Sequence, residues 1–162
     1  MIFKGSALIG NGCKIDIKKD AILEIGRNTG ITGDTTINCH EHISIGDYFS
    51  CAWNVTICDT DFHECYHFND KGKYLPSVNK PIEIGKYVWI CQNATILKGT
   101  TISDWCTVAS NALARGNYVA NNYSIIAGIP AKKSEHKLIR NDLYELSLMG
   151  DFMITKGIKV FG

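Results

Sequence analysis

The amino-acid sequence predicts an all-β protein: a parallel β-helix with one protruding loop and a short C-terminal helix. Three observations predict it. An aliphatic or small apolar residue recurs at every sixth position, a glycine often follows that residue, and the repeat is interrupted by a single long polar segment. A chain of 162 residues is long enough for one domain with a sizeable core.

The six-residue period fits a coil of short strands better than it fits a helix or an ordinary amphipathic strand. A helical stripe needs spacings of three and four, and plain alternation would not single out every sixth residue. Six residues suit a short strand plus a corner, and three such units close a triangular coil whose stacked strands lie about 4.8 Å apart. The repeat runs through Ile25, Ile31 and Ile37, through Ile45, Cys51 and Ile57, and through Ile84, Ile90, Ile96, Ile102, Val108 and Ala114.

The interruption and the C-terminal segment complete the predicted organisation. Residues 58–81 are polar and aromatic and should form a loop that leaves one corner of the coil and returns to it. Residues 137–149 carry spaced leucines among good helix formers, which predicts a helix capping the open end. We therefore expect a β-helix domain over residues 1–133 and a C-terminal helix and tail over residues 134–162.

Charge and cysteine content narrow the class of protein. Seventeen basic and sixteen acidic residues leave a net charge of +1, which argues against a nucleic-acid binder. The sequence shows no apolar run of the roughly 20 residues that a membrane span needs and no signal-peptide pattern. Seven cysteines without a C-x-x-C pair favour small buried side chains over a metal site. We expect a cytoplasmic protein that needs no metal.

The candidate chemistry lies where the repeat gives way to the loop, in Asp59-Thr60-Asp61-Phe62-His63. Histidine is the usual group for proton transfer near neutral pH, so His63 is the candidate general base. A neighbouring carboxylate could fix its tautomer, and both Asp61 and Asp59 are candidates. The alternative is a histidine in a surface loop beside solvated acids.

This junction and the segments after it resemble the hexapeptide-repeat acetyltransferases. The matching segments, in order, are Asp59 to His63, Pro81 to Gly85, Tyr87 to Ile90, Ile96 to Ile102 and Ala127 to Lys132. They look most like the O-acetyltransferases of polysaccharide and lipopolysaccharide synthesis and the galactoside and maltose acetyltransferases. The resemblance implies a left-handed coil, acetyl-CoA as co-substrate, a saccharide hydroxyl or a sugar-nucleotide or lipid-linked sugar as acceptor, and a homotrimer.

The resemblance also implies roles for single residues. Asn54 would orient the acceptor, or else be a corner residue with positive φ. Trp89 would line the pantetheine and acetyl path, or else shield a subunit interface. The backbone N–H of Gln92 would polarise the thioester carbonyl. The nucleotide end of CoA would contact Ser110, Arg115 and Lys132, although either cation could equally be a solvated surface charge.

Three other functions are compatible with the same pattern. The first is an amino-sugar N-acetyltransferase on the same fold. The second is a γ-type carbonic anhydrase, which needs three convergent zinc-binding histidines, and no histidine falls between Ile84 and Ala114. The third is a scaffold without catalytic activity.

Overall fold

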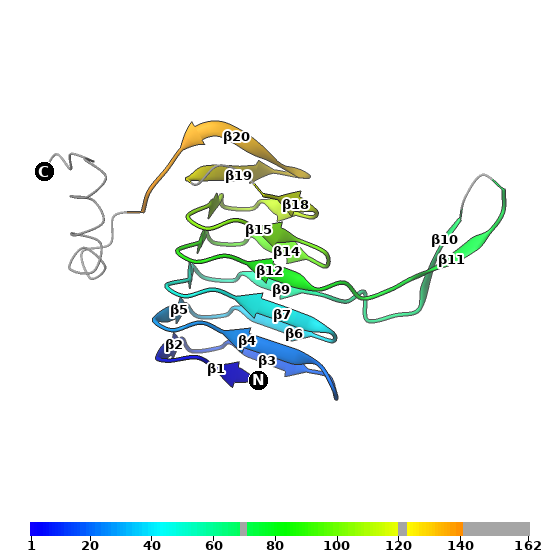
Figure 1. Cartoon of the computed structure of the whole chain (residues 1–162), viewed down its shortest axis with the longest axis horizontal. Helices are drawn as coiled ribbons and strands as arrows, with labels where there is room; N and C mark the ends of the chain where they lie inside the picture. The colour runs from blue at the N-terminus through cyan, green and yellow to red at the C-terminus, as the bar shows by residue number, and fades with distance from the viewer. Residues whose placement is uncertain (69–70, 120–122, 141–162) are drawn as a thin grey trace, which may run out of the picture.

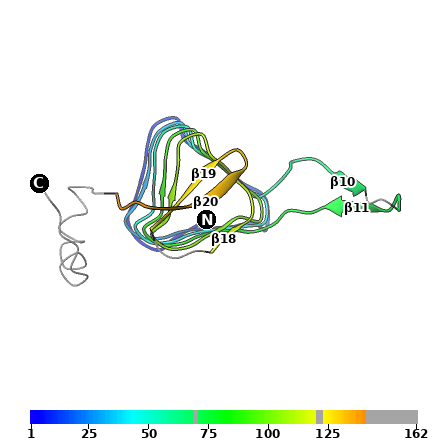
Figure 2. The ribbon, with the colours of Figure 1, turned by 90° about the horizontal axis from the view of Figure 1, so that it is seen from above.

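The computed structural model describes residues 1–68, 71–119 and 123–140, and these residues form a three-sided prism of parallel strands (Figures 1 and 2). Face 1 contains β1 (Ile2–Phe3), β4 (Ile22–Ile25), β7 (His42–Ile45), β12 (Ile82–Ile84), β15 (Thr101–Ile102) and β18 (Asn117–Tyr118). Face 2 contains β2 (Ala7–Ile9), β5 (Thr29–Ile31), β8 (Ser50–Cys51), β13 (Trp89–Ile90), β16 (Thr107–Val108), β19 (Ser124–Gly128) and β20 (Ala131–Lys137). Face 3 contains β3 (Lys14–Ile17), β6 (Thr36–Cys39), β9 (Thr56–Cys58), β14 (Thr95–Leu97) and β17 (Leu113–Ala114).

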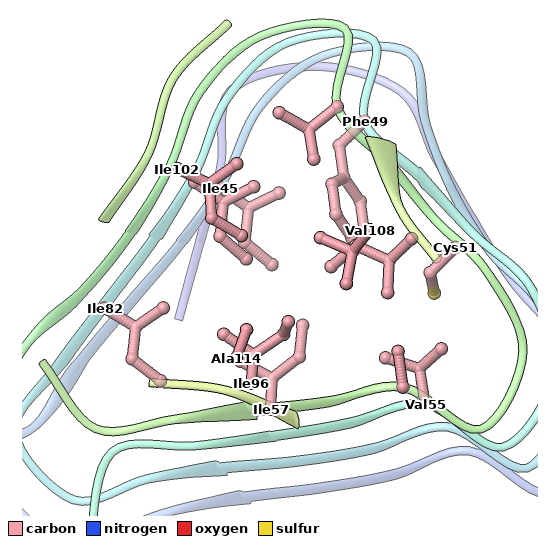
Figure 3. Close-up of a cluster of buried hydrophobic side chains, with 14 of the residues drawn as sticks. Ile45, Phe49, Cys51, Val55, Ile57, Ile82, Ile96, Ile102, Val108 and Ala114 are labelled. Carbon is pink, nitrogen blue, oxygen red and sulfur yellow. The ribbon is translucent and has the colours of Figure 1, made fainter. Parts of the chain in front are cut away.

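The six-residue repeat marks the inward positions of these strands, as predicted. On face 3, Ile57 pairs with Ile37 of the preceding coil and Ile96 of the following one. Matching columns run through Ile45 on face 1 and Cys51 on face 2. All three residues are at most 2% exposed, and they point into the prism from its three walls (Figure 3). The core is therefore three apolar columns, one for each face.

The corners bring together residues in the left-handed backbone conformation. At the corner between faces 2 and 3, positive φ recurs at Gly12, Asp34, Asn54, Asn93 and Asn111. These residue types tolerate that region because they lack a bulky β-substituent or can bond locally. At the corner between faces 1 and 2, positive φ recurs instead at Asn28, Tyr48, Tyr87, Trp105 and Tyr123, mostly aromatic residues for which it is unusual.

The predicted loop leaves the third corner, between faces 3 and 1, as an arm (Figure 1). Its two strands, β10 (Cys65–Phe68) and β11 (Tyr74–Ser77), form an antiparallel hairpin with Cys65 opposite Ser77. Ile57 and Ile96 remain in register across the insertion, so the arm adds to the prism without disturbing its stacking.

The last coil is covered by a strand. β20 pairs antiparallel with β19 after a turn at Ile129 and Pro130. This pairing gives hydrogen-bond partners to the backbone groups of β19 that parallel stacking would leave unpaired at the sheet edge. The predicted helix is therefore wrong at its start, because Lys137 belongs to β20 and residues 138–140 are not helical. Residues 141–149 of that prediction lie outside the described residues, and the division at residue 133 stays a prediction. Within the described part of the chain, no helix is long and apolar enough to cross a membrane.

Candidate functional site

The arm begins in a tight turn that separates the side chains of neighbouring residues. The Thr60 hydroxyl accepts a hydrogen bond from the Phe62 N–H at 3.0 Å, and Phe62 has a φ of 62°. Phe62 packs edge-on against His40 of the preceding coil, with ring centroids 5.3 Å apart. Asp61 instead contacts Lys98, which belongs to the following coil.

His63 follows this turn with its side chain exposed to solvent. Within the described residues its imidazole makes no hydrogen bond or ion pair. The ring is therefore accessible to a substrate, and no described carboxylate fixes its tautomer.

Asp59, one of the two aspartates predicted to orient His63, is fully buried and bonded elsewhere. Its two carboxylate oxygens accept hydrogen bonds from the backbone N–H groups of His40 at 2.7 Å and Glu41 at 2.9 Å. The carboxylate thus closes the corner of the preceding coil, where two backbone donors would otherwise lack a partner.

Asp61, the other candidate, is part of a cluster that we call the root clamp: Asp61, Ser77 and Lys98. The Lys98 ammonium donates to Asp61 Oδ2 at 2.5 Å, to Ser77 Oγ at 2.6 Å and to the Val78 carbonyl at 2.9 Å. Ser77 also donates to Asp61 Oδ2 at 2.7 Å. These hydrogen bonds, that from Lys98 foremost, hold the pKa of Asp61 below its usual value. The clamp ties both ends of the arm to the next coil.

A pocket of about 160 Å³, which we call the root pocket, lies beside the clamp and is lined mainly by polar residues. It is lined by the three clamp residues together with Thr60, His67, Leu97 and Arg115. Arm residues and prism residues both contribute to it, so the pocket exists only because the arm folds against the coil.

The remaining predicted site residues lie on face 2 and on the corner between faces 2 and 3. Trp89 opens β13, Gln92 and Ser110 occupy that corner in successive coils, and Lys132 lies on β20. The guanidinium of Arg140 lies 5.7 Å from the centroid of the Trp89 ring, a cation–π distance. At the same corner the Asn54 side chain donates to Asn93 Oδ1 at 3.0 Å, and its φ is 56°.

The structure thus divides the predicted site into two groups. His63, Asp61 and Arg115 lie at the arm, whereas Asn54, Gln92 and Ser110 lie at the next corner, with Trp89 and Lys132 on face 2. Face 3 separates the two groups within one chain. Sequence reasoning missed Lys98, Ser77 and His67, because their contacts depend on which coil stacks on which.

The buried cysteines are unsuited to nucleophilic chemistry. Burial raises the pKa of the Cys51 thiol to about 11. The pKa of Cys39 is also raised to about 11, by burial and by the charge of Asp59. Both thiols therefore stay protonated at neutral pH and act as small core side chains. Among the described residues, no group of three or more His, Cys, Asp and Glu side chains could hold a metal ion.

The chain is similar in sequence to two proteins that are described as acetyltransferases. No protein-family model matches it. It is 32% identical over 154 residues to Rv3034c of Mycobacterium tuberculosis, described as a probable acetyltransferase, covering 82% of this chain and 50% of that protein. It is 28% identical over 130 residues to WbbJ of Escherichia coli K12, provisionally described as a lipopolysaccharide biosynthesis O-acetyl transferase, covering 76% of this chain and 65% of that protein. The chain thus spans between half and two thirds of these relatives.

Solved structures share the fold of this chain. A hexapeptide-repeat acetyltransferase from Vibrio cholerae, solved with acetyl-CoA, matches with a TM-score of 0.65 at 20% sequence identity, covering 84% of this chain and 70% of that one. A sequence identity of 20% supports a shared fold but not a shared activity. The structural match confirms the predicted coil, so the prism is a left-handed parallel β-helix of the hexapeptide-repeat type.

Proposed function

We propose that the protein is an acetyl-CoA-dependent O-acetyltransferase that acetylates a saccharide hydroxyl, with His63 as the general base. The observation that carries the proposal is an exposed, unpartnered imidazole at the root of an arm on a hexapeptide-repeat prism. The two sequence relatives, both described as acetyltransferases, support the reaction class.

In this mechanism His63 acts first as the general base and then as the general acid. Its neutral imidazole takes the proton of the acceptor hydroxyl while the oxygen attacks the carbonyl carbon of the acetyl thioester. The backbone N–H of Gln92 makes no hydrogen bond within the described residues and is free to stabilise the tetrahedral oxyanion. As the C–S bond breaks, the imidazolium returns its proton to the CoA sulfur, which completes the transfer.

The CoA-binding side of the site is assigned to the second group of residues. The Trp89 ring would flank the pantetheine arm, and Ser110 and Lys132 would contact the nucleotide end. A lysine there suits a phosphate, because an ammonium is a compact positive charge. Binding at this group would require a ligand to compete with, or accommodate, the Arg140 guanidinium above Trp89.

A site that uses both groups requires more than one copy of the chain. His63 and Gln92 lie on different corners of one prism, so an acetyl group held at Gln92 is remote from the base of the same chain. In a cyclic assembly, the arm corner of one prism can face the next corner of its neighbour. We therefore propose a homotrimer with three shared sites.

The experiment that tests the proposal compares two exposed histidines, His63 on the arm and His136 on β20. His63→Ala should lower kcat by about 10²–10⁴-fold, the usual contribution of a general base, while acetyl-CoA still binds. His136→Ala is the matched control, since His136 is also exposed but lies on β20, away from the arm. Acetyl transfer to a panel of neutral, acidic and amino sugars gives the readout.

Nearly unchanged turnover in His63→Ala would remove His63 from this role. A wild-type protein that neither binds acetyl-CoA, as judged by thermal shift, nor transfers acetyl to any sugar would contradict the whole proposal. Transfer to amino sugars alone would replace O-acetylation by N-acetylation.

A further inference from the structure

The root pocket contains one positive charge that no described residue neutralises. Lys98 uses its ammonium on Asp61, Ser77 and the Val78 carbonyl, so its charge is already matched. The guanidinium of Arg115 makes no hydrogen bond or ion pair within the described residues. Counting Lys98, Arg115 and Asp61, the lining has a net charge of +1 with His67 neutral.

The backbone of Arg115 is fixed in place, although its side chain is exposed. The Tyr118 hydroxyl, on a residue only 6% exposed, accepts a hydrogen bond from the Arg115 N–H at 3.1 Å. That hydroxyl also lies 3.1 Å from the Ala131 carbonyl, to which it donates. Arg115 is also close enough to the clamp for its charge to help lower the pKa of Asp61. Arg115 therefore lines the pocket from a backbone position that the Tyr118 hydroxyl holds.

Two other groups in the lining can donate hydrogen bonds to a ligand. The Thr60 hydroxyl accepts from the Phe62 N–H and keeps its own hydrogen for another acceptor. The His67 ring makes no hydrogen bond within the described residues and always carries at least one N–H. Hydrogen-bond donors and a positive charge thus line the same pocket.

We propose that the root pocket binds an anionic group, a carboxylate or phosphate, on the acceptor saccharide, with Arg115 as its main ligand. A guanidinium offers the planar, bidentate geometry that both groups favour. The pocket, at about 160 Å³, is smaller than the roughly 300–1,000 Å³ of sites that enclose a whole small-molecule ligand. It therefore suits one charged substituent, while the rest of the acceptor lies along the arm.

This inference rests on the proposed function and changes the predicted role of one residue. The resemblance to acetyltransferases places Arg115 at the nucleotide end of CoA, together with Ser110. The structure instead places Arg115 among arm residues, across face 3 from Ser110. The acceptor and CoA roles make opposite kinetic predictions, so they can be separated.

The test measures acetyl transfer to matched sugars: glucose with glucuronate and glucose 6-phosphate, and galactose with galacturonate and galactose 6-phosphate. In at least one of these two sets of three, the wild-type enzyme should prefer an acidic sugar to the neutral sugar by at least about tenfold in kcat/KM, as expected for one charge-assisted contact. Arg115→Gln should abolish that preference and leave the KM for acetyl-CoA unchanged. Arg115→Lys should keep part of the preference, and the distant exposed variant Lys14→Gln should keep all of it.

Several results would overturn the inference without touching the proposed function. Equal use of neutral and acidic sugars would do so, and so would an Arg115→Gln variant with a raised KM for acetyl-CoA and an intact preference for acids. If no sugar is acetylated at all, calorimetry measures the binding of glucuronate and glucose 6-phosphate to the wild-type protein and to Arg115→Gln. The inference is wrong if neither sugar binds, or if Arg115→Gln binds them as tightly as the wild-type protein does. Within the acidic sugars, the ratio of carboxylate to phosphate binding identifies which anion the pocket takes.

Discussion

At the residue scale, two aspartates two positions apart take contrasting roles because of burial. Asp59 is fully buried and accepts two backbone hydrogen bonds, so its carboxylate stabilises the fold. Asp61 has a partly exposed side chain and bonds to Lys98 and Ser77, so it holds the arm. The sequence spacing alone makes both aspartates equally good partners for His63.

Removing the Asp59 carboxylate should destabilise the prism strongly. Asp59→Ala leaves the N–H groups of His40 and Glu41 without their acceptor, and each unsatisfied buried donor costs about 1–3 kcal/mol. We expect a loss of about 2–5 kcal/mol in the free energy of unfolding, measured by urea denaturation. Asp16→Ala is the control, because Asp16 is exposed and makes only a surface contact with His40. Equal losses in the two variants would contradict this role for Asp59.

At the element scale, one corner of the prism is stabilised by stacked aromatic rings in a strained backbone conformation. Tyr48, Tyr87 and Trp105 have φ between 57° and 63°, which is unfavourable for bulky side chains. Tyr87 stacks on Tyr48 with ring centroids 4.7 Å apart and on Trp105 with centroids 3.9 Å apart. Ring stacking between coils thus offsets a backbone cost within each coil.

Tyr87, the middle ring of this stack, should contribute more to thermal stability than Tyr48. Tyr87→Ala loses two ring contacts, each worth about 0.5–1.5 kcal/mol beyond area burial, whereas Tyr48→Ala loses one. In both variants an alanine takes a position with positive φ, so the free-energy cost of the left-handed backbone conformation is similar in the two. Thermal unfolding should show the larger decrease in Tm for Tyr87→Ala, and a larger decrease for Tyr48→Ala would argue against stacking as the cause.

The root clamp should respond to acid in a defined direction. The pKa of Asp61 is lower in the folded state than in the unfolded state. Its contribution to the free energy of unfolding is therefore fully present above the unfolded-state pKa of about 3.9, and it is lost as the pH falls through the lower folded-state pKa. The clamp should hold at neutral pH and open only in strong acid. Lys98→Met removes the main cause of the shift, so an NMR titration should show the Asp61 pKa return toward its ordinary value.

The matched control for the clamp is Lys86→Met, which removes an exposed lysine at another corner, near Asp47. Amide exchange of Lys80, whose N–H donates to the Asp59 carbonyl at the root of the arm, should accelerate only in Lys98→Met. An Asp61 pKa that does not change in Lys98→Met would show that the clamp is not what lowers it.

At the scale of the whole molecule, the two groups of site residues lie apart in one chain, and the proposed homotrimer would bring them together. Inactive His63→Ala trimers and inactive Trp89→Ala trimers should regain activity when their chains are mixed and reassembled. With random mixing and one residue from each neighbour, about a quarter of the shared sites contain both native residues. Light scattering should give three times the 17.9 kDa chain mass. No recovery of activity would mean that each chain builds its site alone.

The sequence by itself determined the prism. Inward positions recur every six residues because each wall of the coil needs one strand and one corner, so Ile57, Ile96 and their counterparts could be assigned to the core in advance. It also located the arm, since a polar insertion cannot fill an inward column. It did not predict β20, because residues 131–137 have no apolar period and pair with β19 only through a tight turn.

Only the tertiary structure decided the partners of the candidate site residues. Lys98 follows Asp61 by 37 positions, and they meet because the coil after the arm stacks directly on the coil before it. The same stacking places Arg115 in the root pocket and Ser110 on another corner. Local periodicity fixes which side chains face inward, but the contacts of outward side chains depend on the order of the coils and the path of the arm, which no short pattern encodes.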